Sequence, residues 1–212
     1  AVFKYYNFFA ESLQGLMTSV GLEVSIHTLR LTLPVGISFY TFQAIGYVID
    51  VYRRHAPAEE KLFNTALFVA FFPQLVAGPI ERVTDLMPQL KGPKTQTLSA
   101  LSAGLYLISA GVFKKVFIAD NLAVFTERIF DQPTATANGT LILIGVYAFA
   151  FQIYCDFSGY TDIARGIAKC LGMELSLNFR LPYFATSPQD LWRRWHITLS
   201  QWLRDYLYIP LG

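Results

Sequence analysis

Long apolar stretches separated by shorter polar ones run along this chain. Apolar runs cover residues 33–52, 62–80, 98–119 and 139–171. A helix needs about 20 such residues to cross a hydrocarbon core of about 30 Å. No segment alternates apolar and polar residues over a length that would predict a strand. The pattern therefore predicts an all-α fold, a multi-pass transmembrane helical bundle.

Breaks in this pattern predict where helices bend or end. The run 62–80 contains Pro73, Gly78 and Pro79, and proline removes backbone hydrogen bonds from a helix. A broken helix at membrane depth needs protein or water to cover the freed backbone groups. We expect a kinked or re-entrant segment there. The polar residues 120–138 should end the preceding span, and 178–188, with two prolines, should be a connector.

The final predicted helix has a recognisable start. Ser187 fits the N-cap, Pro188 the first helical position and Asp190 the third, which resembles a capping box. Pro210 and Gly212 should end this helix. The pattern therefore predicts one helix across the tryptophan- and arginine-rich segment.

Helical spacing within that segment would place His196 on one face with Trp192, Arg193 and Ser200. The bland interpretation is a core histidine bonded to a backbone carbonyl. The functional one is a general base, because a neutral imidazole can take a proton from an alcohol and return it. Ser200 as a nucleophile is less favoured, since no third orienting group is evident.

A second polar constellation lies in the run 152–165. Asp156 and Tyr160 should share one helical face, while Ser158 and Asp162 lie nearer the other, where Asp162 can pair with Arg165. A polar network that holds helices together explains these residues, because buried carboxylates need partners. The polar wall of a substrate tunnel is the alternative.

Two charged pairs have plainer interpretations. Lys114 and Lys115 can extend to a membrane interface, and contact with a donor phosphate is the less favoured alternative. Glu81 and Arg82 should form a local pair in a turn. His27 and His55 lie in polar surroundings and should be solvated.

Composition supports the membrane interpretation. Hydrophobic residues make up 53% of the 212 residues and charged residues 15%, against about 25% charged in soluble domains. A net charge of +2 without a basic run gives no indication of nucleic-acid binding. Cys155 and Cys170 lie in apolar context without metal-ligand spacing, so we expect packing residues and no metal site.

The run Trp192-Arg193-Arg194-Trp195-His196, followed by Leu199-Ser200 and Trp202-Leu203-Arg204-Asp205-Tyr206, resembles the signature of the membrane-bound O-acyltransferases. The bacterial alginate O-acetylation branch is the most similar. Supporting stretches are residues 33–40, 77–80, 113–115, 119–122, 156–160 and 209–212. The resemblance therefore covers nearly the whole chain, in order.

The resemblance implies a multi-helix membrane bundle around a tunnel in a bacterial cell (inner) membrane. It implies no bound cofactor and an acyl thioester donor, such as acetyl-CoA, on the cytoplasmic side, where the final helix should lie. Expected partners besides the lipid bilayer are a periplasmic or extracellular acyltransferase and polysaccharide-export proteins. A second family histidine should lie beyond Gly212, so we expect residues 1–212 to be an internal fragment of one transmembrane domain, truncated at both ends.

His196 matches a functional histidine of the family and is the expected catalytic residue. Expected substrate-binding or tunnel residues are Trp192, Arg193, Trp195, Ser200, Arg204, Asp205, Asp156, Ser158, Tyr160 and Asp162. The expected function is acetyl transfer to hydroxyls of an alginate-like exported polysaccharide or a partner protein. Alternatives are peptidoglycan O-acetylation, D-alanyl transfer to teichoic acid and, from another class, a transporter or channel.

Overall fold

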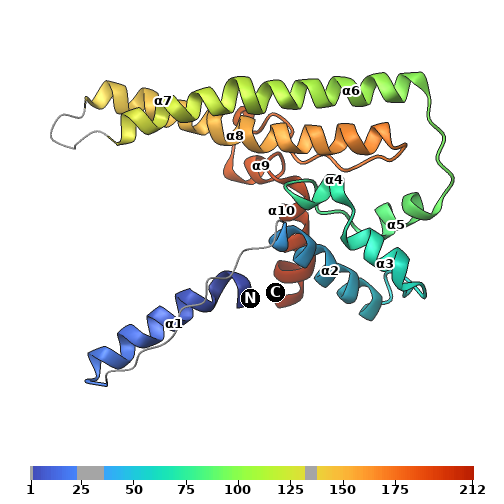
Figure 1. Cartoon of the computed structure of the whole chain (residues 1–212), viewed down its shortest axis with the longest axis horizontal. Helices are drawn as coiled ribbons and strands as arrows, with labels where there is room; N and C mark the ends of the chain where they lie inside the picture. Colours follow the sequence, from blue (N-terminus) through green and yellow to red (C-terminus); the bar gives the residue numbers. More distant parts are fainter. Residues whose placement is uncertain (1, 23–35, 132–137) are drawn as a thin grey trace. The chain divides into compact units, whose positions relative to one another are not determined.

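The computed structural model describes residues 2–22, 36–131 and 138–212, and every regular element in these ranges is helical (Figure 1). The all-α prediction is therefore confirmed. The chain divides into two compact units, residues 1–37 and 38–212. The smaller unit holds α1 (Val2–Ser19). The larger unit holds α2 (Ile37–Tyr52), except its first residue, and all the elements that follow it along the chain.

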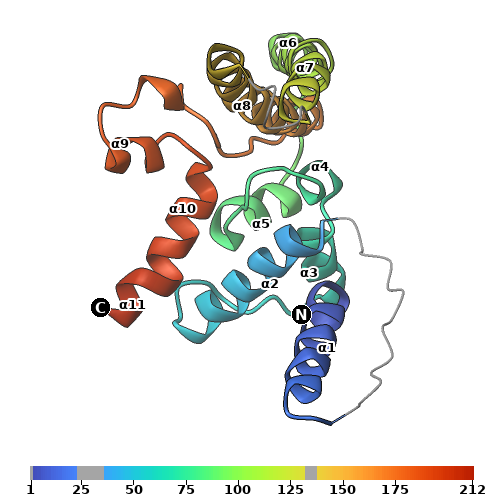
Figure 2. The same cartoon turned by 90° about the vertical axis from the view of Figure 1, so that its left-hand side faces the viewer.

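Two long helices lie side by side in the larger unit (Figures 1 and 2). The first is continuous from Leu98 to Phe130 through α6 (Leu98–Val112), the π-helical η1 (Phe113–Ala119) and α7 (Asp120–Phe130). The second is α8 (Gly139–Cys170), as the apolar run predicted. With 33 and 32 residues, both are long and apolar enough to cross a membrane. At about 1.5 Å per residue each exceeds the hydrocarbon thickness.

The helix ends within the predicted segment 120–138, but at Phe130 and not at Ala119, because α7 continues it for eleven residues. Three of its polar side chains bond within the helix or with α8. Asp120 Oδ1 lies 2.6 Å from Lys115 Nζ, and Asn121 Nδ2 donates to the Phe117 carbonyl at 2.7 Å. Thr126 Oγ1 donates to Gln152 Oε1 of α8 at 2.7 Å. The helix therefore continues through these polar residues as far as Phe130.

Glycines set the close approach of α6 and α8. A Cβ added to Gly104 would lie 2.8 Å from the Gly166 carbonyl oxygen, and one added to Gly111 would lie 2.5 Å from that of Gly159. The reciprocal additions at Gly159 and Gly166 meet the same backbone at 2.8 and 2.6 Å. Small residues that let two backbones touch are typical of helix pairs in membranes.

Three shorter helices lie between α2 and α6 along the chain: α3 (Leu62–Val69), α4 (Phe72–Leu75) and α5 (Val83–Lys91). The break between α3 and α4 confirms that the run 62–80 is not a straight helix. At that break the Phe68 carbonyl accepts from Gln43 Nε2 and Gln74 Nε2, each at 3.0 Å. Two buried amides thus bond a carbonyl that a straight helix would have bonded itself.

After α8, the chain runs through η3 (Pro182–Phe184), α9 (Pro188–Trp192), α10 (Ile197–Leu203), the π-helical η4 (Arg204–Tyr208) and α11 (Ile209–Leu211). The connector over 178–188 is confirmed, and so is the N-cap, since Ser187 Oγ accepts from the Asp190 N–H at 3.1 Å. A single final helix is not observed. Because α9 ends at Trp192 and α10 begins at Ile197, the tryptophan- and arginine-rich segment contains a turn.

Candidate functional site

His196 stands at this turn, as the N-cap of α10. Its backbone is left-handed, with φ 39° and ψ 55°, and its Nδ1 accepts from the Leu199 N–H at 3.3 Å. The expectation that Trp192 and Arg193 share a helical face with His196 is therefore wrong. A left-handed residue ends one helix and starts the next, so helical spacing does not extend across it.

The imidazole of His196 lies among aromatic rings. Its ring centroid is 4.7 Å from Phe157 of α8 and 6.3 Å from Phe39 of α2, which is nearly parallel to it at 16°. Phe179 lies at 6.5 Å. Only 7% of His196 is exposed. This burial lowers the pKa of His196 from 6.5 to about 4, so the ring is neutral at neutral pH.

The bond from Leu199 decides which nitrogen carries the proton. A neutral imidazole has one acceptor and one donor nitrogen. Acceptance of a backbone N–H by Nδ1 favours the tautomer that carries the proton on Nε2. In this conformation Nε2 is a donor that can bond a carbonyl oxygen or a developing oxyanion. Action as a general base, the expected role, requires Nε2 to lose that proton first.

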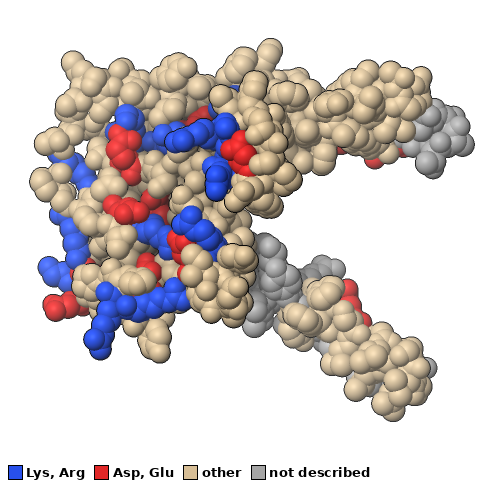
Figure 3. Space-filling model, turned by 180° about the vertical axis from the view of Figure 1, so that it is seen from behind, with Lys and Arg blue, Asp and Glu red and all other residues tan. Residues whose placement is uncertain are grey.

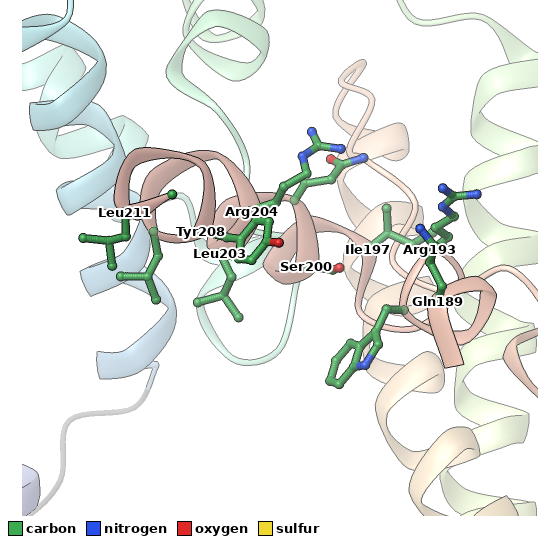
Figure 4. A pocket seen from close by; sticks show the side chains of 12 residues that line it. Gln189, Arg193, Ile197, Ser200, Leu203, Arg204, Tyr208 and Leu211 are labelled. Carbon is green, nitrogen blue, oxygen red and sulfur yellow. The ribbon is translucent and has the colours of Figure 1, made fainter. Parts of the chain in front are cut away.

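An open groove of about 1110 Å³ lies along α9, α10, η4 and α11, next to His196 in sequence. Figure 4 shows Ser200 between Arg193 and Arg204 in this groove. Trp192, 58% exposed, also lines it. His196 is not among the residues that line the groove, whereas the adjacent Ile197 is.

Trp195 and Asp205 contact residues outside this groove. Trp195 packs edge-on against Phe179, with ring centroids 5.0 Å apart. Asp205 accepts from Arg204 Nε at 2.7 Å and pairs with Arg82 Nη2 at 2.8 Å. Asp205 therefore joins η4 to the chain before α5, while Trp195 belongs to an aromatic cluster.

Charged residues of opposite sign lie close together on the larger unit (Figure 3). Lys114 Nζ lies 2.6 Å from Asp162 Oδ2, and Arg165 Nη1 is 3.7 Å from the other oxygen of this carboxylate. Lys115 Nζ lies 2.7 Å from Asp156 Oδ1. The close contact of α6 with α8 brings both lysines to carboxylates, whereas their expected position at a membrane interface stays a prediction.

Of the four α8 residues expected to line a tunnel, three contact charged side chains and Ser158 is buried. Tyr160 shares Lys115 with Asp156, since Lys115 Nζ lies 5.6 Å from the Tyr160 ring centroid. The pairing of Asp162 with Arg165 is confirmed. Ser158 is buried, and its hydroxyl has no partner among the residues that the structure describes. These contacts fit a network between helices, whereas the tunnel interpretation stays a prediction.

Sequence reasoning misjudged Glu81 and Arg82. They do not pair with each other: Glu81 accepts from Ser176 N at 2.6 Å and Ser176 Oγ at 3.0 Å, while Arg82 reaches Asp205. Burial raises the pKa of the Glu81 carboxyl. Arg82 also lies over the Tyr206 ring, 4.3 Å from its centroid. Both side chains hold distant segments together.

Two further polar residues near His196 were missed. Asn178 is fully buried and Thr198 is 6% exposed. A single polar residue between Leu177 and Phe179 was the available signal for Asn178. In the described part of the chain, no group of three or more His, Cys, Asp or Glu side chains could hold a metal ion. Cys155 and Cys170 are free thiols.

Comparison with known proteins gives consistent matches. The Pseudomonas putida protein named "Probable alginate O-acetylase AlgI" is 48% identical over 99% of this chain and 42% of its own length. The peptidoglycan O-acetyltransferase of Helicobacter pylori is 40% identical over 99% of this chain and 44% of its own length. The teichoic acid D-alanyltransferase of Bacillus subtilis is 30% identical over 82% of this chain and 45% of its own length. The chain thus spans less than half the length of these relatives.

The family model described as "MBOAT, membrane-bound O-acyltransferase family" matches residues 53–212. The match includes both long apolar helices, the left-handed His196 and the groove beside it. On this evidence the chain belongs to the membrane-bound O-acyltransferase family.

Proposed function

We propose that this chain is part of a membrane-embedded acyltransferase that moves an acetyl group from a cytoplasmic thioester, such as acetyl-CoA, towards hydroxyls of an exported polysaccharide. The observation that carries this proposal is the family match across the His196 segment, together with 48% identity to an alginate O-acetylase. A multi-pass protein of the bacterial inner membrane suits a donor and an acceptor on opposite sides. Handover to a periplasmic acyltransferase and polysaccharide-export proteins belongs to the same proposal.

The proposed reaction is a nucleophilic substitution at the thioester carbonyl. The acceptor hydroxyl oxygen attacks the thioester carbonyl carbon, the C–S bond breaks, and the thiolate takes up the proton that the hydroxyl loses. The Nε2–H of His196 would bond the oxygen on which negative charge develops. Removing one such donor costs about 10²–10³-fold in rate. Another group would then accept the hydroxyl proton, consistent with the second histidine that the family resemblance implies.

The groove is the proposed site for the donor. Arg193 and Arg204 line it with Ser200 between them, and guanidinium groups bind phosphate in bidentate fashion. Ion pairs within the described ranges join Arg194 to Asp190 and Arg204 to Asp205, and none involves Arg193. Arg204 is already bonded to Asp205 and would hold a phosphate less freely.

The test compares His196→Asn with His55→Asn in the full-length protein. Asparagine adopts left-handed backbone readily and is a good N-cap, so His196→Asn removes the imidazole while α10 keeps its start. The side chain of His55 is 64% exposed, which makes it a matched control. We expect acetyl-ester content of the polymer to fall at least 10-fold with His196→Asn, at unchanged protein amount, and not with His55→Asn.

Wild-type esterification in His196→Asn would refute the role of His196. The same cells distinguish the acceptors, since ester measured on peptidoglycan, or D-alanine on teichoic acid, would favour the corresponding relatives. Each is a second candidate because of its identity to this chain. The alginate-type acceptor is favoured by higher identity.

A further inference from the structure

We propose that Asn178 and Thr198 are positioning residues that hold His196 in the conformation needed for acyl transfer. This inference rests on the function proposed above. It comes from the hydrogen bonds that surround the turn, because these link His196 to two segments far from it in the sequence.

Asn178 binds the two residues that follow His196. Its backbone carbonyl accepts from the Ile197 N–H at 3.0 Å. Its Oδ1 accepts from the Thr198 N–H at 3.2 Å and from Thr198 Oγ1 at 2.7 Å. The Thr198 hydroxyl in turn accepts from the Ile80 N–H at 3.0 Å. Three segments of the chain therefore meet directly after His196.

The residues before His196 are held by the same connector. The Arg180 N–H donates to the Arg194 carbonyl at 2.9 Å. Phe179, between Asn178 and Arg180, contacts the rings of Trp195 and His196. Residues 178–180 thus form backbone hydrogen bonds both before the histidine, at Arg194, and after it, at Ile197.

Such support is needed because the His196 backbone is unfavourable on its own. A left-handed backbone is strained for a residue other than glycine and persists only where its surroundings enforce it. If the bonds were lost, His196 would relax and carry its imidazole away from Phe157 and Phe39. A misplacement of about 1 Å can cost about 10²-fold in rate.

Burial of Asn178 supports a specific role for its side chain. Asn178 is 0% exposed, and its Nδ2 finds no partner among the described residues. A buried donor without a partner destabilises the folded protein. A leucine at this position would fill similar space without that cost. The feature that leucine lacks is Oδ1, which accepts both bonds from Thr198.

The test uses Thr198→Val, Thr198→Ser and Asn178→Leu in the full-length protein. Valine keeps the shape of threonine but removes the hydroxyl, whereas serine keeps the hydroxyl. We expect Thr198→Val and Asn178→Leu to lower kcat for acyl transfer by about 10–10²-fold with KM for the donor little changed. Thr198→Ser should recover most of the loss. Thr140→Val, at an exposed position of α8, is the control.

A second measurement does not depend on activity. Diethylpyrocarbonate modifies neutral, accessible imidazoles, and mass spectrometry gives the rate at each histidine. Buried His196 should react slowly in the wild type and several-fold faster in Thr198→Val, while exposed His55 stays unchanged. Unfolding would instead be detected as a lower amount of monodisperse protein.

Unchanged reactivity of His196 in both Thr198→Val and Asn178→Leu would overturn the positioning role. An equal loss of kcat in Thr198→Ser and Thr198→Val would also overturn it, because the hydroxyl would then not matter. If His196→Asn is fully active but its protection still depends on Thr198, the proposed function of His196 fails while the positioning stands. The two failures are therefore distinguishable.

Discussion

A methyl group at position 111 should push α6 and α8 apart. In Gly111→Ala the new Cβ would lie 2.5 Å from the Gly159 carbonyl oxygen, 2.7 Å from Ile163 Cγ1 and 2.9 Å from Ile163 N. Unstrained contacts between non-bonded heavy atoms begin at about 3.5 Å, so the new Cβ would be about 1 Å too close to the Gly159 oxygen. Two of these three atoms belong to the α8 backbone and cannot rotate away.

The expected loss follows from two opposing effects. Overpacking costs about 1–3 kcal/mol, and contact with rigid backbone favours the upper end. Alanine recovers about 1 kcal/mol of helix propensity relative to glycine. The net loss is about 2 kcal/mol, and separating the helices also weakens the contact of Lys114 with Asp162.

Thermal melting of the detergent-solubilised full-length protein, followed by size-exclusion chromatography, measures this effect. Gly139→Ala is the matched control, because nothing lies within 4 Å of a Cβ there. We expect Tm to fall by about 2–4 °C in Gly111→Ala and to stay unchanged in the control. If both variants melt with the wild type, the direct contact between Gly111 and Gly159 is not what sets the distance between these helices.

Three other perturbations give further tests. Lys115→Met leaves two carboxylates without their lysine, whereas Asp156→Asn leaves Lys115 with a remaining partner, so immunoblots of membranes should give less protein for Lys115→Met; the reverse order would contradict this pairing. Arg193→Gln should raise the KM for acetyl-CoA more than Arg204→Gln does, and donor titrations in which neither changes would remove the donor from the groove. The pKa of His196 is lowered to about 4 in the folded protein, whereas in the unfolded chain it is about 6.5. The unfolded chain therefore binds a proton at a pH where the folded protein does not, so the free energy of unfolding should fall as pH drops from about 6.5 to about 4. His196→Asn should lose that dependence in melting curves.

Features set by neighbouring residues could be predicted from the sequence. The N-cap at Ser187 depends on the Asp190 N–H only three residues away. The break after Val69 follows from the local chemistry of proline. The length of α8 follows from one continuous apolar run. In each case the cause and the effect lie within a few residues of each other.

Features set by distant residues could not be predicted. The turn at His196 contains neither glycine nor proline, and it is enforced by Asn178, whose bonds reach Thr198 across 20 positions. Lys114 and Lys115 reach carboxylates because glycines bring α6 against α8. Helical periodicity assumes that the helix continues, so it gives no warning where tertiary hydrogen bonds end it.

The chemistry of His196 is therefore linked to the start of α10. Burial keeps the imidazole neutral, and the Leu199 N–H occupies Nδ1, which leaves the Nε2–H as the free polar group of the ring. That group can donate to an oxygen in the observed conformation. It can accept a proton only if Nδ1 carries the hydrogen instead, and Nδ1 can do so only after releasing Leu199. A general base at His196 would thus have to uncap α10 during turnover, whereas a hydrogen-bond donor would not. The bond at Nδ1 therefore supports the donor role proposed for His196, in which a second residue accepts the proton.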